Sequence, residues 1–193
     1  MNNKLLTSIR RLQVLFSVAV FILVTIMCHL VTGFDIKEIQ LSVWGSHPIV
    51  GEAWNMAIIL MSFTILSNVV IWIYRHPRLK YKLLFYTLFS IPSICLFIVG
   101  YFPIKYEALH SIPAFIYFFM YPLIIFVMVF INRMYISYNE WVKHMIICLL
   151  MIIVPLLLMS QFKGMGLAEI AHALMVSTWN LMILKKHKNY EQN

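Results

Sequence analysis

The chain has 193 residues, of which 62% are hydrophobic, 15% are aromatic and 11% are charged. A soluble domain usually carries about 25% charged residues, and a single core of this size could not bury so much apolar surface. The composition therefore excludes an ordinary soluble domain and indicates an integral membrane protein whose apolar surface is covered by lipid.

The basic residues give a formal net charge of +8, a value that also occurs in nucleic-acid-binding proteins. They form short clusters between apolar runs, however, and no patch with interleaved aromatic residues. We therefore predict membrane lipids as partners and no nucleic acid. The three cysteines, Cys28, Cys95 and Cys148, lie in apolar runs without a short motif spacing, so we expect neither a cofactor nor a thiolate metal site.

Six apolar runs have the length of about 17–25 residues that a membrane-spanning helix needs. The longest connection, residues 33–53, leaves no room for a separate soluble domain. We therefore predict an all-α fold in which residues 1–193 form a single integral membrane domain, a polytopic six-transmembrane-helix bundle. In chain order the predicted spans are residues 12–32, 54–74, 83–102, 110–131, 143–160 and 166–184.

Lysine and arginine residues predict the orientation of these spans. If the N-terminus is cytoplasmic, twelve of the fifteen basic residues face the cytoplasm and three face the outside. Cytoplasmic loops are enriched in Lys and Arg, so this distribution predicts that the N- and C-termini are both cytoplasmic. The three outer basic residues are Lys37, Lys105 and Lys163.

Four prolines lie within the predicted spans: Pro92, Pro113, Pro122 and Pro155. Each one removes a backbone N–H and leaves the carbonyl one turn earlier without its usual partner. Such positions kink helices, and in a membrane bundle the kinks either open a cavity or serve ordinary packing. The sequence favours packing but is compatible with both.

Ionisable and amide side chains gather at the predicted outer ends of the spans. Glu169 and His172 are three residues apart and share one face of the last helix, and His110 lies in the first turn of the fourth. Charged groups within a span usually face the bundle interior or a water-filled cavity, so we expect these three side chains to line one outward-facing pocket. The pocket candidates are His110, Glu169, His172, Asn55, Asp35 and Glu52, with Asp35 or Glu52 as a lid.

Three kinds of site fit these residues. They could form a structural cluster of hydrogen bonds that joins helix ends, a pocket for a ligand or substrate, or a metal centre. The Glu-x-x-His spacing at residues 169–172 lacks the second histidine of the helical His-Glu-x-x-His zinc motif. We therefore assign no metal site from the sequence.

Short motifs spread over residues 35–179 resemble those of one known family. They are Leu41-Ser42-Val43-Trp44-Gly45 with Asn55, Gly100-Tyr101-Phe102-Pro103 with Leu109-His110, Ala114, Phe118 and Pro122, and Gly166 and Glu169 with Trp179. Together they resemble the prokaryotic membrane proteins of domain-of-unknown-function family 998 and, more distantly, the eukaryotic damage-regulated autophagy modulator and Frag-type proteins. The resemblance implies a six-helix plan, a prokaryotic cytoplasmic (inner) membrane, and characteristic family positions for Asn55, His110 and Glu169.

Three functions are compatible with the sequence. The first, favoured because no complete catalytic signature is present, is a non-enzymatic membrane protein that binds or senses a lipid or a partner through the outer pocket. The alternative is a small intramembrane enzyme that acts on a lipid headgroup through His110, Glu169 and His172. The third is a small transporter or channel. The sequence assigns no catalytic residue, and it leaves open whether the protein forms a homo-oligomer.

Overall fold

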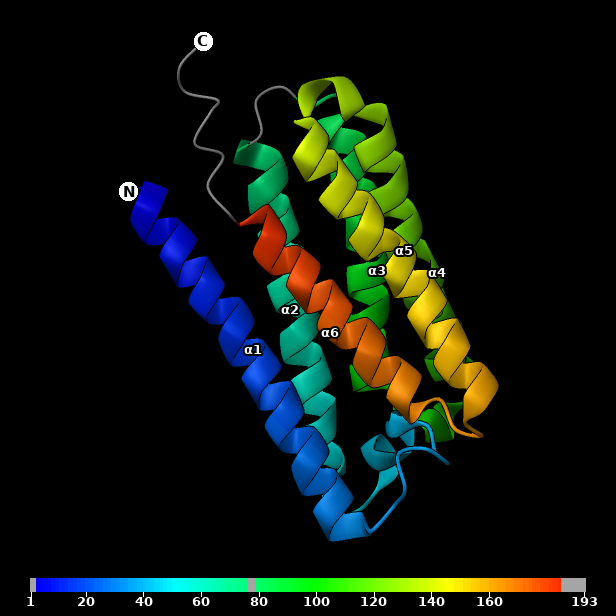
Figure 1. Ribbon diagram of the computed structural model, residues 1–193. Helices are drawn as coiled ribbons and strands as arrows, with labels where there is room; N and C mark the ends of the chain where they lie inside the picture. The colour runs from blue at the N-terminus through cyan, green and yellow to red at the C-terminus, as the bar shows by residue number, and fades with distance from the viewer. Residues whose placement is uncertain (1–2, 76–78, 185–193) are drawn as a thin grey trace.

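The computed structural model describes residues 3–75 and 79–184 as an antiparallel bundle of α-helices (Figure 1). These described residues contain no β-strand, so the prediction of an all-α fold is confirmed. Three short 3-10 helices lie in the connections: η1 (Leu41–Ser46), η2 (Ile104–Tyr106) and η3 (Arg133–Tyr135). The six α-helices are α1 (Asn3–Thr32), α2 (Gly51–Arg75), α3 (Lys82–Tyr101), α4 (Ala108–Ile131), α5 (Tyr138–Gln161) and α6 (Gly166–Ile183).

Five helices of the described chain, α1 to α5, are long and apolar enough to cross a membrane. The fold therefore agrees with the composition in indicating a multi-pass integral membrane protein. The remaining helix, α6, has 18 residues and does not belong to this set. Its buried face carries polar side chains, among them His172, Ser177 and Asn180.

Two helices begin five or more residues earlier than the hydrophobic pattern predicts. α1 begins at Asn3 instead of Leu12, and α5 begins at Tyr138 instead of Lys143. Hydrophobicity marks only the part of a helix that suits lipid, whereas backbone hydrogen bonding continues into the polar residues beyond it. At α5 the hydroxyl of Ser137 accepts a hydrogen bond from the Glu140 amide (3.4 Å) and caps the start of the helix.

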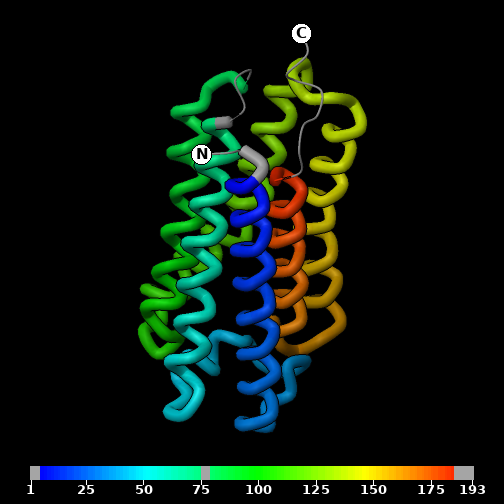
Figure 2. Tube along the Cα trace, turned by 90° about the vertical axis from the view of Figure 1, so that its left-hand side faces the viewer, coloured from blue at the N-terminus to red at the C-terminus, as the bar shows by residue number. Residues whose placement is uncertain are grey.

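Helices that follow one another in the chain pack side by side, and α6 closes the bundle by contacting α1 and α2 (Figure 2). We call the end where α1 begins and α6 ends the terminal end. The opposite end, which carries η1 and η2, is the loop end. At the terminal end the guanidinium of Arg11 donates a hydrogen bond to the carbonyl of Leu184 (3.2 Å), so the first and last helices are joined there.

An aromatic cluster around Trp179 fills the centre of the bundle. Trp179 is fully buried and stacks on Phe89 of α3 with ring centroids 5.6 Å apart. Trp72 of α2 and Tyr121 of α4 meet it edge-on at 6.1 and 5.8 Å. Its indole N–H donates a hydrogen bond to Nδ1 of His144 on α5 (3.2 Å). Because such aromatic pairs add to the stabilisation from apolar burial, the cluster holds five helices together.

The connection from α1 to α2 folds back against the loop end, and we call its residues 36–46 the cap. Trp44 of the cap is fully buried, and its indole N–H donates to the hydroxyl of Thr32 at the end of α1 (3.1 Å). The amide of Gly166 at the start of α6 donates to the Ile39 carbonyl (2.8 Å). A Cβ atom on Gly166 would lie 2.5 Å from another carbonyl oxygen of the cap, so this backbone contact requires glycine.

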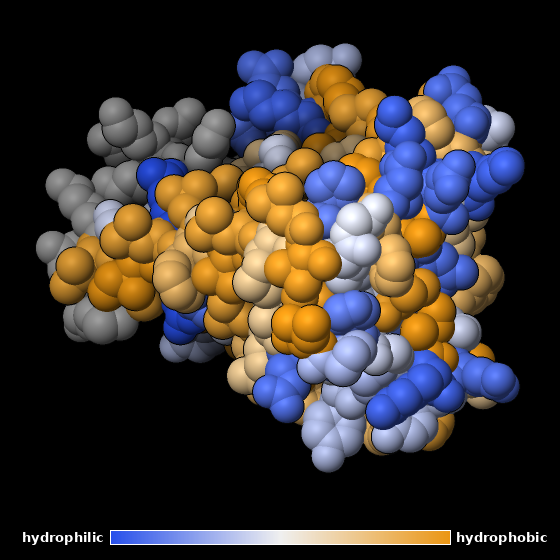
Figure 3. All heavy atoms as spheres, turned by 90° about the horizontal axis from the view of Figure 1, so that it is seen from below, coloured by the Kyte–Doolittle hydropathy of each residue, from blue (hydrophilic) through white to orange (hydrophobic). Residues whose placement is uncertain are grey.

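The outer surface of the bundle exposes many large apolar side chains, such as those of Leu23 (66% exposed) and Leu30 (76%). Seen from the loop end, hydrophilic side chains gather on one part of the surface and apolar side chains cover much of the rest (Figure 3). This distribution suits contact with lipid along the helices and with water at the loops.

Candidate functional site

His110 is a buried histidine in the first turn of α4, with 4% of its surface exposed. Its Nδ1 lies 2.7 Å from the carbonyl oxygen of Phe102, at the end of α3. A carbonyl can only accept a hydrogen bond, so Nδ1 carries the proton and Nε2 of the neutral ring is an acceptor. No described residue forms a hydrogen bond with Nε2. The hairpin between α3 and α4 therefore fixes the ring and leaves one nitrogen available.

Glu169 lies in the first turn of α6, where the helix dipole favours a carboxylate. Its Oε2 accepts a hydrogen bond from the backbone amide of Leu41 (2.7 Å), at the start of η1. The other carboxyl oxygen, Oε1, has no hydrogen-bond partner among the described residues. One oxygen of Glu169 thus holds the cap to α6, and the second is free to meet another group.

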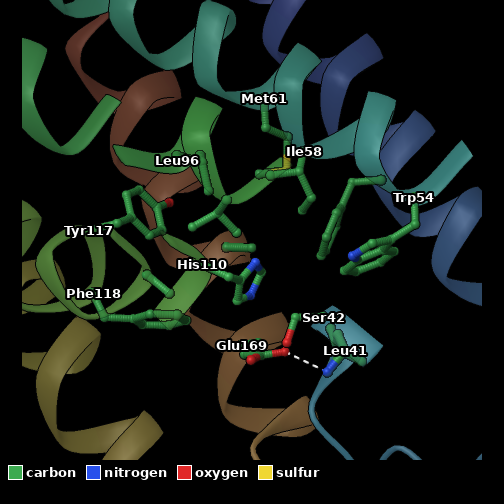
Figure 4. A pocket seen from close by; sticks show the side chains of 14 residues that line it. Leu41, Ser42, Trp54, Ile58, Met61, Leu96, His110, Tyr117, Phe118 and Glu169 are labelled. Atoms are coloured by element: carbon green, nitrogen blue, oxygen red, sulfur yellow. Dashed lines mark hydrogen bonds between the residues drawn. The ribbon is translucent and has the colours of Figure 1, made fainter. Parts of the chain in front are cut away.

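His110 and Glu169 both line a small cavity of about 70 Å³ inside the loop end of the bundle (Figure 4). The cap contributes Leu41 and Ser42 to its wall, and Tyr117 of α4 lies on the opposite side. Ser42 is only 8% exposed, and its hydroxyl has no hydrogen-bond partner among the described residues. The cap, α4 and α6 therefore each bring to this cavity a polar atom that has no hydrogen-bond partner among the described residues, and the Tyr117 hydroxyl in its wall has none either.

A second cavity of about 270 Å³ lies between the cap, α4, α5 and the start of α6. It shares five lining residues with the smaller cavity, so His110 and Glu169 stand where the two meet. Its other polar residues, Gln40 and Ser111, are exposed at the rim. The five shared residues are Ser42, His110, Ala114, Phe118 and Glu169.

The far walls of the larger cavity are apolar and come from α4 and α5. They include Phe115 and Phe119 of α4 and Leu156 of α5, whose side chains are 64%, 52% and 51% exposed on the outside of the bundle. The cavity therefore runs from a polar end at His110 and Glu169 to an apolar side that faces the surface between α4 and α5. No lysine or arginine lines either cavity.

His172 lies outside both cavities, although its spacing from Glu169 predicts a shared pocket. It is 1% exposed, and its Nδ1 lies 3.4 Å from the carbonyl oxygen of Met151 on α5. Pro155 explains this contact, because a proline has no N–H to offer the carbonyl four residues earlier. The ring of Phe118, which lines both cavities, contacts the His172 ring with centroids 4.5 Å apart.

The other three candidates stabilise the loop end or face solvent. The amide nitrogen of Asn55 donates to the Gly45 carbonyl (3.1 Å) and ties α2 to the cap. Asp35 is exposed, and its Oδ1 accepts a hydrogen bond from the Lys37 amide (2.9 Å) within the same turn. Glu52 is exposed in the first turn of α2. None of the three lines either cavity, so neither carboxylate covers the pocket as a lid.

No family model, curated protein or solved structure matches this chain. The resemblance to family 998 therefore stays a prediction, and the function has to be inferred from the site. Within residues 3–75 and 79–184, no group of three or more His, Cys, Asp or Glu side chains is placed to hold a metal ion.

Two kinds of residue that line the cavities could not be predicted from the sequence. Ser42 reaches the cavity because the cap folds inward, and a single serine in a connection carries no signal of that. The apolar residues of α5, such as Leu156, look like any lipid-facing residue in the sequence. Pro155, which also lines the larger cavity, is the one feature of α5 that predicts irregular packing nearby.

Proposed function

We propose that this protein binds a lipid of a prokaryotic cytoplasmic membrane, with the two joined cavities at the loop end as its binding site. In this proposal all six helices span the membrane, as the resemblance to family 998 also implies, and both termini are cytoplasmic, as the distribution of Lys and Arg predicts. The alternation of the helices supports an even number of crossings, because α1 begins and α6 ends at the same end of the bundle (Figure 1).

The amphipathic shape of the larger cavity is the observation that carries the proposal. A membrane lipid has a polar headgroup joined to apolar chains, and the cavity joins a polar end at His110 and Glu169 to an apolar side between α4 and α5. A headgroup that meets Nε2 of His110 and the Ser42 hydroxyl would supply hydrogen bonds that both groups lack within the described chain.

Two observations favour binding over the alternatives of catalysis and transport. An acid–base mechanism through His110, Glu169 and His172 needs all three at one reacting group, but His172 bonds to α5 and lines neither cavity. Transport sites usually lie near the middle of the membrane beside broken helices. Here the site lies at one end, and the Trp179 cluster fills the centre.

The test is to measure lipid that stays bound after purification in a mild detergent, by native mass spectrometry and by extraction. Ala114 lines both cavities, so Ala114→Phe should fill them and block the ligand. Ile112→Phe is the matched control, because Ile112 is 60% exposed on the same helix and lines neither cavity. We expect Ala114→Phe to reduce retained lipid at least about fivefold, which corresponds to about 1 kcal/mol of binding free energy.

Equal retention of lipid by the two variants would contradict the proposal. Turnover of a lipid by the purified protein, abolished by His110→Ala, would instead support the enzymatic alternative.

A further inference from the structure

The hydrogen-bonding groups at the polar end of the larger cavity limit which lipid headgroups can bind there. Resting on the proposed function, we infer that the bound lipid has an uncharged headgroup with a free hydroxyl, as in a mono- or diacylglycerol, and not a phosphate or carboxylate headgroup. The inference depends on which groups donate and which accept hydrogen bonds in the cavity, and on its charge.

Two hydrogen-bond acceptors at the junction of the cavities have no donor among the described residues. In the neutral His110 ring, the Nδ1–H that donates to the Phe102 carbonyl (2.7 Å) leaves Nε2 as an acceptor. Glu169 has Oε1 left over after Oε2 accepts the Leu41 amide (2.7 Å). A ligand group that can donate a hydrogen bond is therefore required, and an ionised phosphodiester or carboxylate cannot donate.

The cavity also lacks the positive charge that anionic headgroups need. Phosphate sites in proteins often use arginine or lysine side chains. No lysine or arginine lines either cavity. The ammonium of Lys105, on a loop of the same end, lies over the ring of Tyr106 (5.3 Å). An anion would therefore meet the Glu169 carboxyl group without a compensating cation.

Ser42 can donate a hydrogen bond to a hydroxyl headgroup, which it cannot do to an ammonium. Its buried hydroxyl can donate as well as accept, and it has no partner among the described residues. A ligand hydroxyl can donate to His110 or Glu169 and accept from Ser42, whereas an ammonium group can only donate. The arrangement of polar atoms therefore suits a hydroxyl.

The size of the cavity limits how much of the lipid it holds. Its volume of about 270 Å³ is near the lower end of ligand pockets, about 300 Å³. This space suits the headgroup and the first part of one chain along the wall formed by Phe115 and Leu156, and the opening between α4 and α5 lets the rest of the lipid lie among the membrane lipids.

The experiment compares four probes that share one oleoyl or oleyl chain: monooleoylglycerol, oleoyl lysophosphatidic acid, oleic acid and oleylamine. Each is titrated into the full chain in phosphatidylcholine nanodiscs, and binding is measured by native mass spectrometry. We expect monooleoylglycerol to bind at least about tenfold more tightly than the lysophosphatidic acid, a difference of about 1.4 kcal/mol. Ala114→Phe should abolish this binding, and Ile112→Phe should leave it unchanged.

Two variants test the assignment of the polar groups. His110→Phe keeps a buried ring but removes the acceptor, so monooleoylglycerol should bind at least about tenfold more weakly. Glu169→Gln keeps an oxygen for the Leu41 amide and replaces the acidic carboxyl group with a neutral amide, so binding of the lysophosphatidic acid should strengthen relative to the wild type.

The outcomes separate the inference from the proposed function. If the lysophosphatidic acid or oleic acid binds as tightly as monooleoylglycerol, or oleylamine binds most tightly, the hydroxyl inference is overturned while lipid binding stands. If Ala114→Phe and wild type bind every probe equally, the cavity is not the lipid site and the proposed function fails as well.

Discussion

Glu169 contacts the cap through one carboxyl oxygen and lines the cavity beside it. Two substitutions of Glu169 separate its hydrogen bond with the cap from its acidic character. Glu169→Gln retains an oxygen that accepts from the Leu41 amide, whereas Glu169→Ala removes it and leaves a buried donor unpaired. We expect Glu169→Ala to lower the free energy of unfolding by about 1–3 kcal/mol and Glu169→Gln to lower it by less than about 1 kcal/mol. Equilibrium unfolding in mixed detergent and dodecyl sulfate micelles measures both.

Glu38 provides the control for this comparison. It is an exposed carboxylate of the cap itself, so Glu38→Ala should change the free energy of unfolding by no more than about 0.5 kcal/mol. A loss as large as that of Glu169→Ala would show that removing any acidic residue weakens this end, and that the bond to Leu41 has no special part.

The sequence predicts some residues of the site and not others for a physical reason. His110 and Glu169 begin helices at one depth, and an antiparallel bundle brings such positions together, so their common location follows from the order of the spans. His172 shares a helix face with Glu169, yet its partner is a carbonyl that Pro155 leaves free on α5. A helical spacing describes one helix and cannot show what the neighbouring helix offers.

At the scale of elements, the contact between α5 and α6 depends on the pairing of Pro155 with His172. The Met151 carbonyl loses its helical partner to Pro155 and lies 3.4 Å from Nδ1 of His172. In Pro155→Ala the restored amide can bond to this carbonyl, so the histidine becomes less important. We therefore expect His172→Ala to be less destabilising in the Pro155→Ala background, with a coupling of about 0.5–1.5 kcal/mol.

A double-mutant cycle in the same micelle unfolding assay measures this coupling. Thr178→Ala is a suitable control on α6, because its hydroxyl bonds within its own helix, to the Leu174 carbonyl (2.8 Å). Its effect should be the same with and without Pro155. Purely additive effects of Pro155→Ala and His172→Ala would show that the bond between the two helices contributes nothing to stability.

The sequence predicts the helices better than the conformation of their connections, and the cap illustrates the physical reason. Each span is set by local hydrophobicity, which the sequence carries directly. The cap is held instead by contacts with distant residues, such as the Thr32 hydroxyl for Trp44 and the Gly166 amide for Ile39. Nothing in the sequence of the cap itself distinguishes a connection that folds inward from one that extends into solvent.

At the scale of the whole molecule, the proposed six crossings with cytoplasmic termini would place the loop end outside the cell and η3 inside. Asp35 at the loop end is exposed, and Met134 of η3, at the other end, is 90% exposed. In intact bacterial cells we expect a membrane-impermeant maleimide to label Asp35→Cys strongly and Met134→Cys only after permeabilisation. The native cysteines Cys28, Cys95 and Cys148 are buried and should give little background.

A tag fused after residue 193 completes the topology test. Six spans require it to be protected in intact cells, like Met134→Cys, whereas a helix α6 that does not cross would leave it on the same side as Asp35→Cys. If Met134→Cys is labelled in intact cells and Asp35→Cys is not, the bundle has the opposite orientation and the cavity lies on the cytoplasmic side.

The bond between the Leu41 amide and Glu169 joins residues that are 128 positions apart in the chain, which has a consequence for biosynthesis. A chain is made and inserted from its N-terminus, so the cap emerges long before α6 exists. Until α6 is inserted, the cap lacks both the carboxylate and the Gly166 amide that hold it, and the cavity lacks one wall. The cavity is therefore completed late in synthesis, and a chain that stops before Gly166 carries the cap but not the wall that α6 provides.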